Sequence, residues 1–250
     1  MNTMIRKHRQ QGLTLIEILV ALVISLFLLA GLLQLFISLR VSAKVQENLS
    51  RVQENGRYAL DYISRLTRLA GSRSRFNIER GLSFKEVFPS VQAVQGTNNG
   101  GPNSSDTITV AFEGEGPGQG DVRDCVNAQV GENATASNVL SISNSNSLQC
   151  VSGGQTQPIV DNVENMQILY GENTDGDTWG VADRYVPASD VGRWDRVVSA
   201  RISLLLRTAE NYLADSPQPY TFNGATVTPA STDRYLRRVF TTTVTLRNER

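Results

Sequence analysis

A single carboxylate stands inside the most apolar stretch of the sequence. Glu17 is the only charged residue from Leu13 to Leu39. A helix of that length, at about 1.5 Å rise per residue, crosses the ~30 Å hydrocarbon layer of a bilayer. A charge costs roughly 2.5–3.5 kcal/mol near the centre of such a helix and less near its end. The pattern therefore predicts a membrane-spanning helix whose acidic side chain needs a partner.

Cys125 and Cys150 are the two cysteines of the chain. Lys and Arg concentrated before the apolar run predict a cytoplasmic N-terminus, with everything after Leu39 outside. In an oxidising compartment outside the cytoplasm, the two cysteines are expected to pair with each other. Closing a loop of about 25 residues contributes roughly 3–3.5 kcal/mol in the chain-entropy model. The alternative is metal ligation, for which two thiolates without a histidine are a poor set.

An acidic cluster in the second half of the chain has oxygen ligands at alternate positions, as calcium prefers. The candidate ligands are Asn173, Asp175, Asp177 and Asp183. Against calcium, Gly176 comes too early for an EF-hand loop, and Arg184 occupies the place of the bidentate glutamate. A solvated Asp-Gly turn is the favoured interpretation, so we expect no cofactor, with calcium as the alternative.

Catalysis finds little support in the composition. The only histidine, His8, precedes the apolar run, so the rest of the chain cannot form a Ser-His-Asp or Cys-His site. Zero formal net charge and a pI near 6.6 give no reason to expect nucleic acid as a partner. Arg234, Arg237 and Arg238 form a small basic cluster that we interpret as a solvated strand edge. The sequence therefore favours a protein that is not an enzyme.

Helical periodicity continues beyond the apolar run. Apolar residues recur at three- and four-residue steps over 41–70, while i,i+4 pairs such as Asp61 with Arg65 lie on another face. Gly71 is the expected C-cap. We therefore expect one helix over 13–70 that is apolar all round in its first half and amphipathic in its second.

The remainder of the chain reads as β-structure. Strands are expected at 106–112, 139–142, 148–151, 198–206 and 238–247. The segment 159–170 mixes periods and is predicted to be a short turn followed by a strand. The polar, proline-bearing segment 208–233 is expected to lie outside the core. The predicted fold class is α+β, with the long N-terminal helix packed on a mainly antiparallel sheet.

The start of the chain resembles the class III signal of type IV prepilins. Basic residues lead to Gly12, which directly precedes the apolar run. The resemblance implies that a prepilin peptidase cuts between Gly12 and Leu13 and methylates the new N-terminus at Leu13. Glu17 is then fifth from that end, where the family uses a glutamate for filament assembly. Leu13 departs from the usual phenylalanine at the first mature position.

Four parts make up the organisation that we expect. They are a leader peptide (1–12), a transmembrane and assembly helix (13–39), an amphipathic helix extending into the globular domain (40–71), and a β-rich periplasmic domain (72–250). An uncleaved membrane anchor is the alternative for the N-terminus, but such an anchor has no use for Glu17. A secretory signal peptide fits less well, because its apolar region is ~7–15 residues long.

Motifs over nearly the whole chain resemble the PilW family of minor pilins. They include Asn55–Leu60, Arg68–Gly71, Asp124-Cys125, Leu148–Cys150, Val163–Gly171 and Leu236–Asn248. The resemblance implies the pilin fold and a structural subunit of the minor-pilin complex that primes assembly of a retractable type IV pilus and lies at its tip. Implied partners are the prepilin peptidase, the inner membrane, other minor pilins, the major pilin and a PilY-type tip adhesin.

Two other functions remain open at this point. A type II secretion pseudopilin of the J type shares the features of the first 70 residues, so the sequence after Gly100 must separate it from PilW. A membrane-anchored periplasmic binding or sensor domain is the alternative from a different class. Such a domain is expected to have a ligand pocket and no Glu17.

Overall fold

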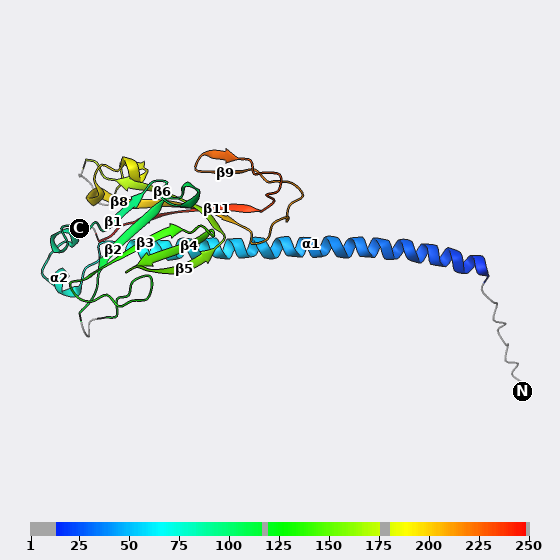
Figure 1. The fold of residues 1–250 in the computed structure, drawn as a ribbon, viewed down its shortest axis with the longest axis horizontal. Coiled ribbons are helices and arrows are strands. Elements are labelled where there is room, and N and C mark those ends of the chain that lie inside the picture. The colour runs from blue at the N-terminus through cyan, green and yellow to red at the C-terminus, as the bar shows by residue number, and fades with distance from the viewer. Residues whose placement is uncertain (1–13, 117–119, 176–180, 249–250) are drawn as a thin grey trace, which may run out of the picture. The chain divides into compact units, whose positions relative to one another are not determined.

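The computed structural model describes residues 14–116, 120–175 and 181–248. The chain divides into two compact units, Met1–Glu47 and Asn48–Arg250. One long helix, α1 (Leu15–Arg68, 54 residues), contributes to both units (Figure 1). Each unit is described below by itself.

Within the second unit, α1 is amphipathic. Val52, Ala59 and Ile63 lie on one stripe and are at most 3% exposed. On another face, the guanidinium of Arg65 lies 2.8 Å from the carboxylate of Asp61, and both side chains are exposed. The predicted amphipathic second half of the helix is therefore confirmed. Its apolar stripe meets the sheets, and its charged face remains in water.

The end of α1 depends on Gly71, as predicted. Gly71 has φ +70°, the left-handed conformation that glycine adopts without steric cost, and its N–H donates to the carbonyl of Ala111 (2.9 Å). The α-helix stops at Arg68, two residues before the predicted end. The difference arises because the last turn tightens, with the N–H of Leu69 donating to Leu66 (3.0 Å).

Two short helices connect α1 to the first strand, and the sequence analysis did not predict them. They are α2 (Arg75–Glu79) and α3 (Phe84–Val87). Each begins with a serine that caps it, Ser74 in α2 and Ser83 in α3. In α3, Glu86 completes a capping box by accepting from the N–H of Ser83 (2.6 Å).

The first sheet is an antiparallel meander of five strands in sequence order. Its strands are β1 (Val94–Thr97), β2 (Thr107–Glu113), β3 (Thr135–Ile142), β4 (Ser147–Ser152) and β5 (Gln155–Asp161). The hairpin predicted at 139–151 is β3 with β4, in which Leu140 lies opposite Cys150. The strand predicted at 106–112 corresponds to β2.

The second sheet has four strands in the order β11-β8-β6-β7, all paired antiparallel. Its strands are β6 (Val163–Glu172), β7 (Arg184–Val186), β8 (Val197–Arg207) and β11 (Arg237–Thr245). The predicted late strands correspond to β8 and β11. The predicted α+β class is thus confirmed, with two antiparallel sheets in place of one.

The prediction of a short turn and then a strand over 159–170 is wrong in its first part. Residues up to Asp161 belong to β5, and β6 begins at Val163. Asn162 alone separates the two strands, in the left-handed region with φ +64°. Asparagine tolerates this conformation better than most residues, so the chain passes from one sheet to the other within a single position.

The segment 208–233 lies mostly outside the core, as predicted. It contains the small hairpin of β9 (Tyr220–Phe222) and β10 (Ala225–Val227). Within the segment, which the structure describes throughout, Thr208 and Phe222 are buried. Short 3-10 helices complete the fold at Pro102–Ser104, Ala188–Asp190 and Trp194–Arg196.

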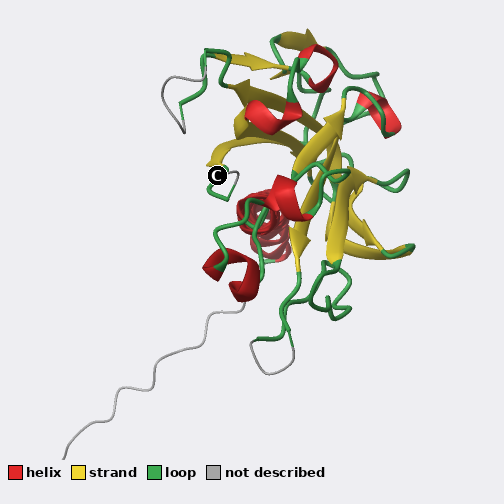
Figure 2. Cartoon of the chain, turned by 90° about the vertical axis from the view of Figure 1, so that its left-hand side faces the viewer, coloured by secondary structure: helices red, strands yellow, loops and turns green. Residues whose placement is uncertain are grey.

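One core joins the buried stripe of α1 to both sheets, whose strands lie around the helix in Figure 2. Tyr170, in β6, is fully buried at its centre. The indole of Trp194 meets its ring edge-on, with centroids 4.9 Å apart. Trp194 is partly buried and packs against this core.

Candidate functional site

The first described turn of α1 holds Glu17 by local contacts. Its Oε2 accepts from the backbone N–H of Thr14 (3.4 Å) and lies 3.5 Å from the Thr14 hydroxyl. The backbone N–H groups of Glu17 and Ile18 donate to the carbonyl of Thr14 (3.1 and 3.2 Å). The carboxylate therefore lies at the positive end of the helix dipole, reaching back as in a capping box. The predicted cleavage and methylation positions, Gly12 and Leu13, lie outside the described residues.

The helix around Glu17 is apolar on every side. Every residue of Leu15–Leu39 is exposed, and Glu17 carries the only charge among them. The hydroxyl of Ser25 is satisfied within the helix by donating to the carbonyl of Ala21 (2.7 Å). In the described part of the chain, α1 is the one helix that is long and apolar enough to cross a membrane. A helix of this kind is stable in lipid or among other apolar helices.

The predicted disulfide is confirmed. Cys125 and Cys150 are joined, with their Cα atoms 6.2 Å apart. Cys150 is fully buried in β4, whereas Cys125 lies in the loop before β3 and donates its N–H to Oδ1 of Asn138 (2.8 Å). The bond therefore fixes an irregular loop to β4 of the five-stranded sheet.

The calcium candidates are partly outside the described residues, since Asp177 falls in 176–180. Oδ2 of Asp183 accepts from the N–H and the hydroxyl of Thr174 (2.6 and 3.0 Å). The N–H of Asp175 is a longer donor to the same atom (3.4 Å). The backbone bond from Thr174 contributes most to lowering the pKa of Asp183. Asn173 is buried and donates to the carbonyl of Val181 (3.3 Å).

These contacts are those of an Asp-stabilised turn. Among the described residues, no three His, Cys, Asp or Glu side chains come together as a metal site would require. Calcium binding stays a prediction. Arg184, at the place of the EF-hand glutamate, lies 2.7 Å from the buried carboxylate of Glu172. Burial alone would raise the pKa of Glu172, but the bond from Arg184 and the N–H of Arg193 outweigh it, and the pKa is lowered.

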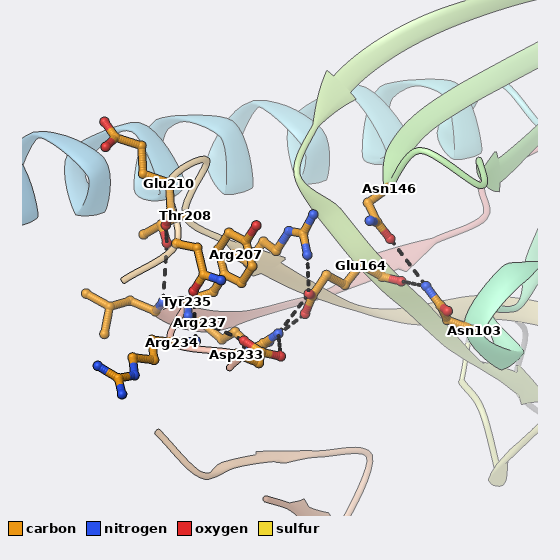
Figure 3. Close-up of polar contacts among 12 residues, drawn as sticks. Asn103, Asn146, Glu164, Arg207, Thr208, Glu210, Asp233, Arg234, Tyr235 and Arg237 are labelled. Carbon is orange, nitrogen blue, oxygen red and sulfur yellow. Dashed lines mark hydrogen bonds and ion pairs between the residues drawn. The ribbon is translucent and has the colours of Figure 1, made fainter. Parts of the chain in front are cut away.

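A second charged group, which the sequence analysis missed, lies at the end of the four-stranded sheet (Figure 3). The side chain of Arg237 is 5% exposed and bonds Glu164 (2.6 Å) and Asp233 (2.7 Å). Arg207 approaches the same Glu164 carboxylate at 3.3 Å. Burial would lower the pKa of Arg237, yet its two carboxylate partners raise it overall. For Asp233, burial would raise the pKa, but the contact with Arg237 lowers it overall.

This network corrects the interpretation of a solvated strand edge for Arg237, whereas Arg238 is exposed on the edge strand β11, as expected. Arg237 is buried because its guanidinium is fully engaged, which makes burial of the charge tolerable. The i,i+4 spacing of Asp233 and Arg237 was a signal available in the sequence. Glu164, by contrast, is 73 residues from Arg237, and no local pattern connects them.

The network lies where the two ends of the 208–233 segment come together. The N–H of Thr208 donates to Leu236 (2.9 Å), and the hydroxyl of Thr208 accepts from the N–H of Leu236 (3.2 Å). The guanidinium of Arg207 stacks over Tyr235 at 4.2 Å, and that of Arg237 over Tyr220 at 5.0 Å. These groups are held mainly by one another, although Nε of Arg207 is buried without a hydrogen-bond partner among the described residues, and their contacts support a structural role.

Comparison with known families adds two matches. The family model described as Type IV Pilus-assembly protein W matches residues 129–248. The model of the prokaryotic N-terminal methylation motif matches residues 7–33. Among solved structures, a type IV-like pilin from Thermus thermophilus is similar at 17% identity and a TM-score of 0.40, over 78% of this chain and 97% of that chain. No curated protein matches the sequence.

A methylation motif on an exposed apolar helix, followed in the chain by an α+β domain, is an arrangement similar to that of type IV pilin-like proteins. More narrowly, its C-terminal half carries a PilW domain. The family matched there is one of type IV pilus-assembly proteins. The N-terminal apolar helix and the methylation motif indicate membrane anchoring, processing by a prepilin peptidase and assembly with other pilins.

Proposed function

We propose that this chain is a minor pilin, a non-enzymatic structural subunit of the complex that initiates type IV pilus assembly and lies at the pilus tip. The observation that carries the proposal is the first half of α1. It exposes apolar side chains all round and has one carboxylate, Glu17, in its first turns, within the residues that the methylation motif matches. Such a surface is stable in the inner membrane or among the apolar helices of other subunits.

Processing precedes assembly in this proposal. A prepilin peptidase cuts between Gly12 and Leu13 and methylates Leu13. The protein then spans the inner membrane once, with its β-rich domain in the periplasm, until it enters the pilus. The Cys125–Cys150 disulfide supports this location, because such bonds persist in oxidising compartments.

Glu17 sets the axial position of the subunit. Transfer from lipid into a bundle of apolar helices leaves an unpaired charge at a cost of several kcal/mol. Cleavage creates a positive amino group at Leu13, which pairs with Glu17 of the same or a neighbouring subunit. Only one register brings these charges together, so the pair selects it over arbitrary sliding of the helices.

Membership of a secretion apparatus is the second candidate, because a J-type pseudopilin has the same kind of N-terminal helix. The match of the PilW model to residues 129–248 favours the pilus. A periplasmic binding or sensor domain is less well supported, since it has no need of a methylation motif or of Glu17.

Deletion of the gene separates these candidates. We expect loss of surface pili and of twitching, restored by the wild-type chain, with exoprotein secretion unchanged. Normal piliation together with failed secretion would establish the pseudopilin instead.

Glu17→Val tests the assembly role within the same strain. The variant removes a costly charge from the bilayer, so membrane insertion and folding of the β-rich domain should be intact. Its crosslinking to other minor pilins should fall, whereas Ser25→Ala, which removes a hydroxyl satisfied inside the helix, should crosslink as the wild type does. Undiminished crosslinking and normal piliation by Glu17→Val would exclude a register role.

A further inference from the structure

Strand β11 has an open side along its whole length. It lies at one end of the strand order and, among the described strands, pairs only with β8. The N–H of Leu246, just beyond β11, donates to the carbonyl of Val198 (2.9 Å), so even-numbered residues turn their backbone groups toward β8. Odd-numbered residues therefore turn theirs away. Among the described residues, none hydrogen-bonds to the outward backbone groups of Val239, Thr241 or Thr243.

This open side is exposed, uncharged and regular over 239–245. Val239, Thr241, Thr243 and Thr245 are exposed. The segment contains no proline, glycine or charged residue, and its pairing with β8 shows no shift of register. An unprotected edge of this length is a template for another strand, and proteins usually protect such edges.

The other three edges of the two large sheets are protected in known ways. β5 contains Pro158, and its register with β4 shifts beside that residue, which indicates a bulge at Ile159. β7 has three residues and β1 has four, so both are too short to template a long strand. Of the four described edge strands in these sheets, β11 alone is unprotected, which indicates a binding function for its edge.

Charge indicates what kind of strand fits there. β8 and β11 contain four arginines and no acidic residue. Arg207 and Arg237 are bonded to Glu164, and Arg201 stacks on Tyr185. Arg238 and Arg247, at the two ends of the open edge, are exposed and have no acidic partner in the described part of the chain.

A second copy of this chain would bring these arginines together and be repelled. An extended segment with acidic residues at both ends of a β-branched or polar centre is complementary in hydrogen bonding and in charge.

We propose that β11 binds an extended, acid-flanked segment of another pilin subunit by antiparallel or parallel strand addition. That the bound segment belongs to another pilin rests on the proposed function. The open edge of β11 is independent of that function. The contact is distinct from the helix contact through Glu17, so the chain has two separate surfaces for its neighbours.

Thr243→Pro is the sharpest variant, because it removes an N–H that points away from β8 and leaves the β8 ladder intact. Thr243→Val keeps the N–H and the β-branched shape, and it serves as the matched control. The full-length chain is solubilised from the inner membrane with its partners, and the recovered pilins are quantified by mass spectrometry. We expect about tenfold lower recovery with Thr243→Pro, and wild-type recovery with Thr243→Val.

Equal recovery with Thr243→Pro would overturn the strand contact and leave the proposed function standing. If the wild-type chain recovers no other pilin, both the strand contact and the proposed function are overturned. If it recovers only copies of itself, the proposal that the partner is an acid-flanked segment of another subunit is overturned. Should Thr243→Pro fold poorly, amide hydrogen exchange on the wild-type complex decides. Thr241 and Thr243 should exchange more slowly in the complex than in the free chain, and unchanged rates would overturn the contact.

Discussion

The two halves of α1 have the same helical backbone and opposite surroundings. Side chains of Leu15–Leu39 are exposed on every face, whereas Val52, Ala59 and Ile63 are buried in the domain. The first half has an apolar surface that no described residue of its own unit covers. The second half has one apolar stripe, and the two sheets cover it. The comparison shows which half is completed by the chain itself and which half requires a membrane or another subunit.

The two halves also treat charge differently. The first has a single carboxylate, Glu17, held by the N–H of Thr14. In the domain that contains the second half, the carboxylates of Glu164 and Glu172 are each paired with an arginine. These carboxylates have positive partners within the domain, while Glu17 is available for a positive group outside the described chain.

Truncation of one leucine-sized side chain in each half gives the largest expected difference. Ile63 is fully buried, so Ile63→Ala should lower the free energy of unfolding of the domain by about 2–5 kcal/mol. Leu29 is 58% exposed, and Leu29→Ala should leave that free energy unchanged. Urea unfolding of the detergent-solubilised chain, followed by tryptophan fluorescence, measures both. Equal losses from the two variants would contradict the division of the helix.

Glycines in the two halves provide a second, smaller contrast. A Cβ on Gly56 would lie 2.5 Å from Cε2 of Phe240, whereas one on Gly31 would meet nothing within 4 Å. Overpacking costs about 1–3 kcal/mol, which exceeds the gain of about 1 kcal/mol from replacing glycine in a helix. Gly56→Ala should therefore lower the midpoint of thermal unfolding, and Gly31→Ala should not. A raised midpoint for Gly56→Ala would mean that Phe240 moves aside freely.

Acid should act on the domain more weakly than these substitutions. Arg237 lowers the pKa of Asp233, so the stability that Asp233 contributes is present above its ordinary pKa of about 3.9 and is lost as pH falls through the lowered value. Asp233→Asn should cost about 1–2 kcal/mol at pH 7 and less at pH 3. Urea midpoints at the two pH values test this. A cost that does not shrink in acid would show that Asp233 does not act through its charge.

Much of this contrast could be predicted from the sequence, because it depends on local patterns. The change from an all-round apolar run to a single stripe marks the two halves, and Gly71 marks the end of the helix. Alternation predicts β8 and β11, and the cysteine count predicts the disulfide. The acid at Glu17 stands out because nothing around it in the sequence is charged.

What could not be predicted depends on contacts between distant segments. Glu164 and Arg237 meet only after β6, β8 and β11 have paired, so the buried network has no local signature. Asn162 replaces the predicted turn by one left-handed residue, a choice that periodicity cannot detect. The open side of β11 is likewise a property of strand order, which the alternation of a single strand does not reveal.

The central claim is that the first half of α1 is the assembly helix of a processed pilin. Mass spectrometry of the N-terminal peptide from the membrane-extracted chain tests it most directly. The account predicts an N-methylated peptide that begins at Leu13, and an unprocessed chain when Gly12 is replaced by a bulky residue. Wild-type protein that still begins at Met1 would contradict the account.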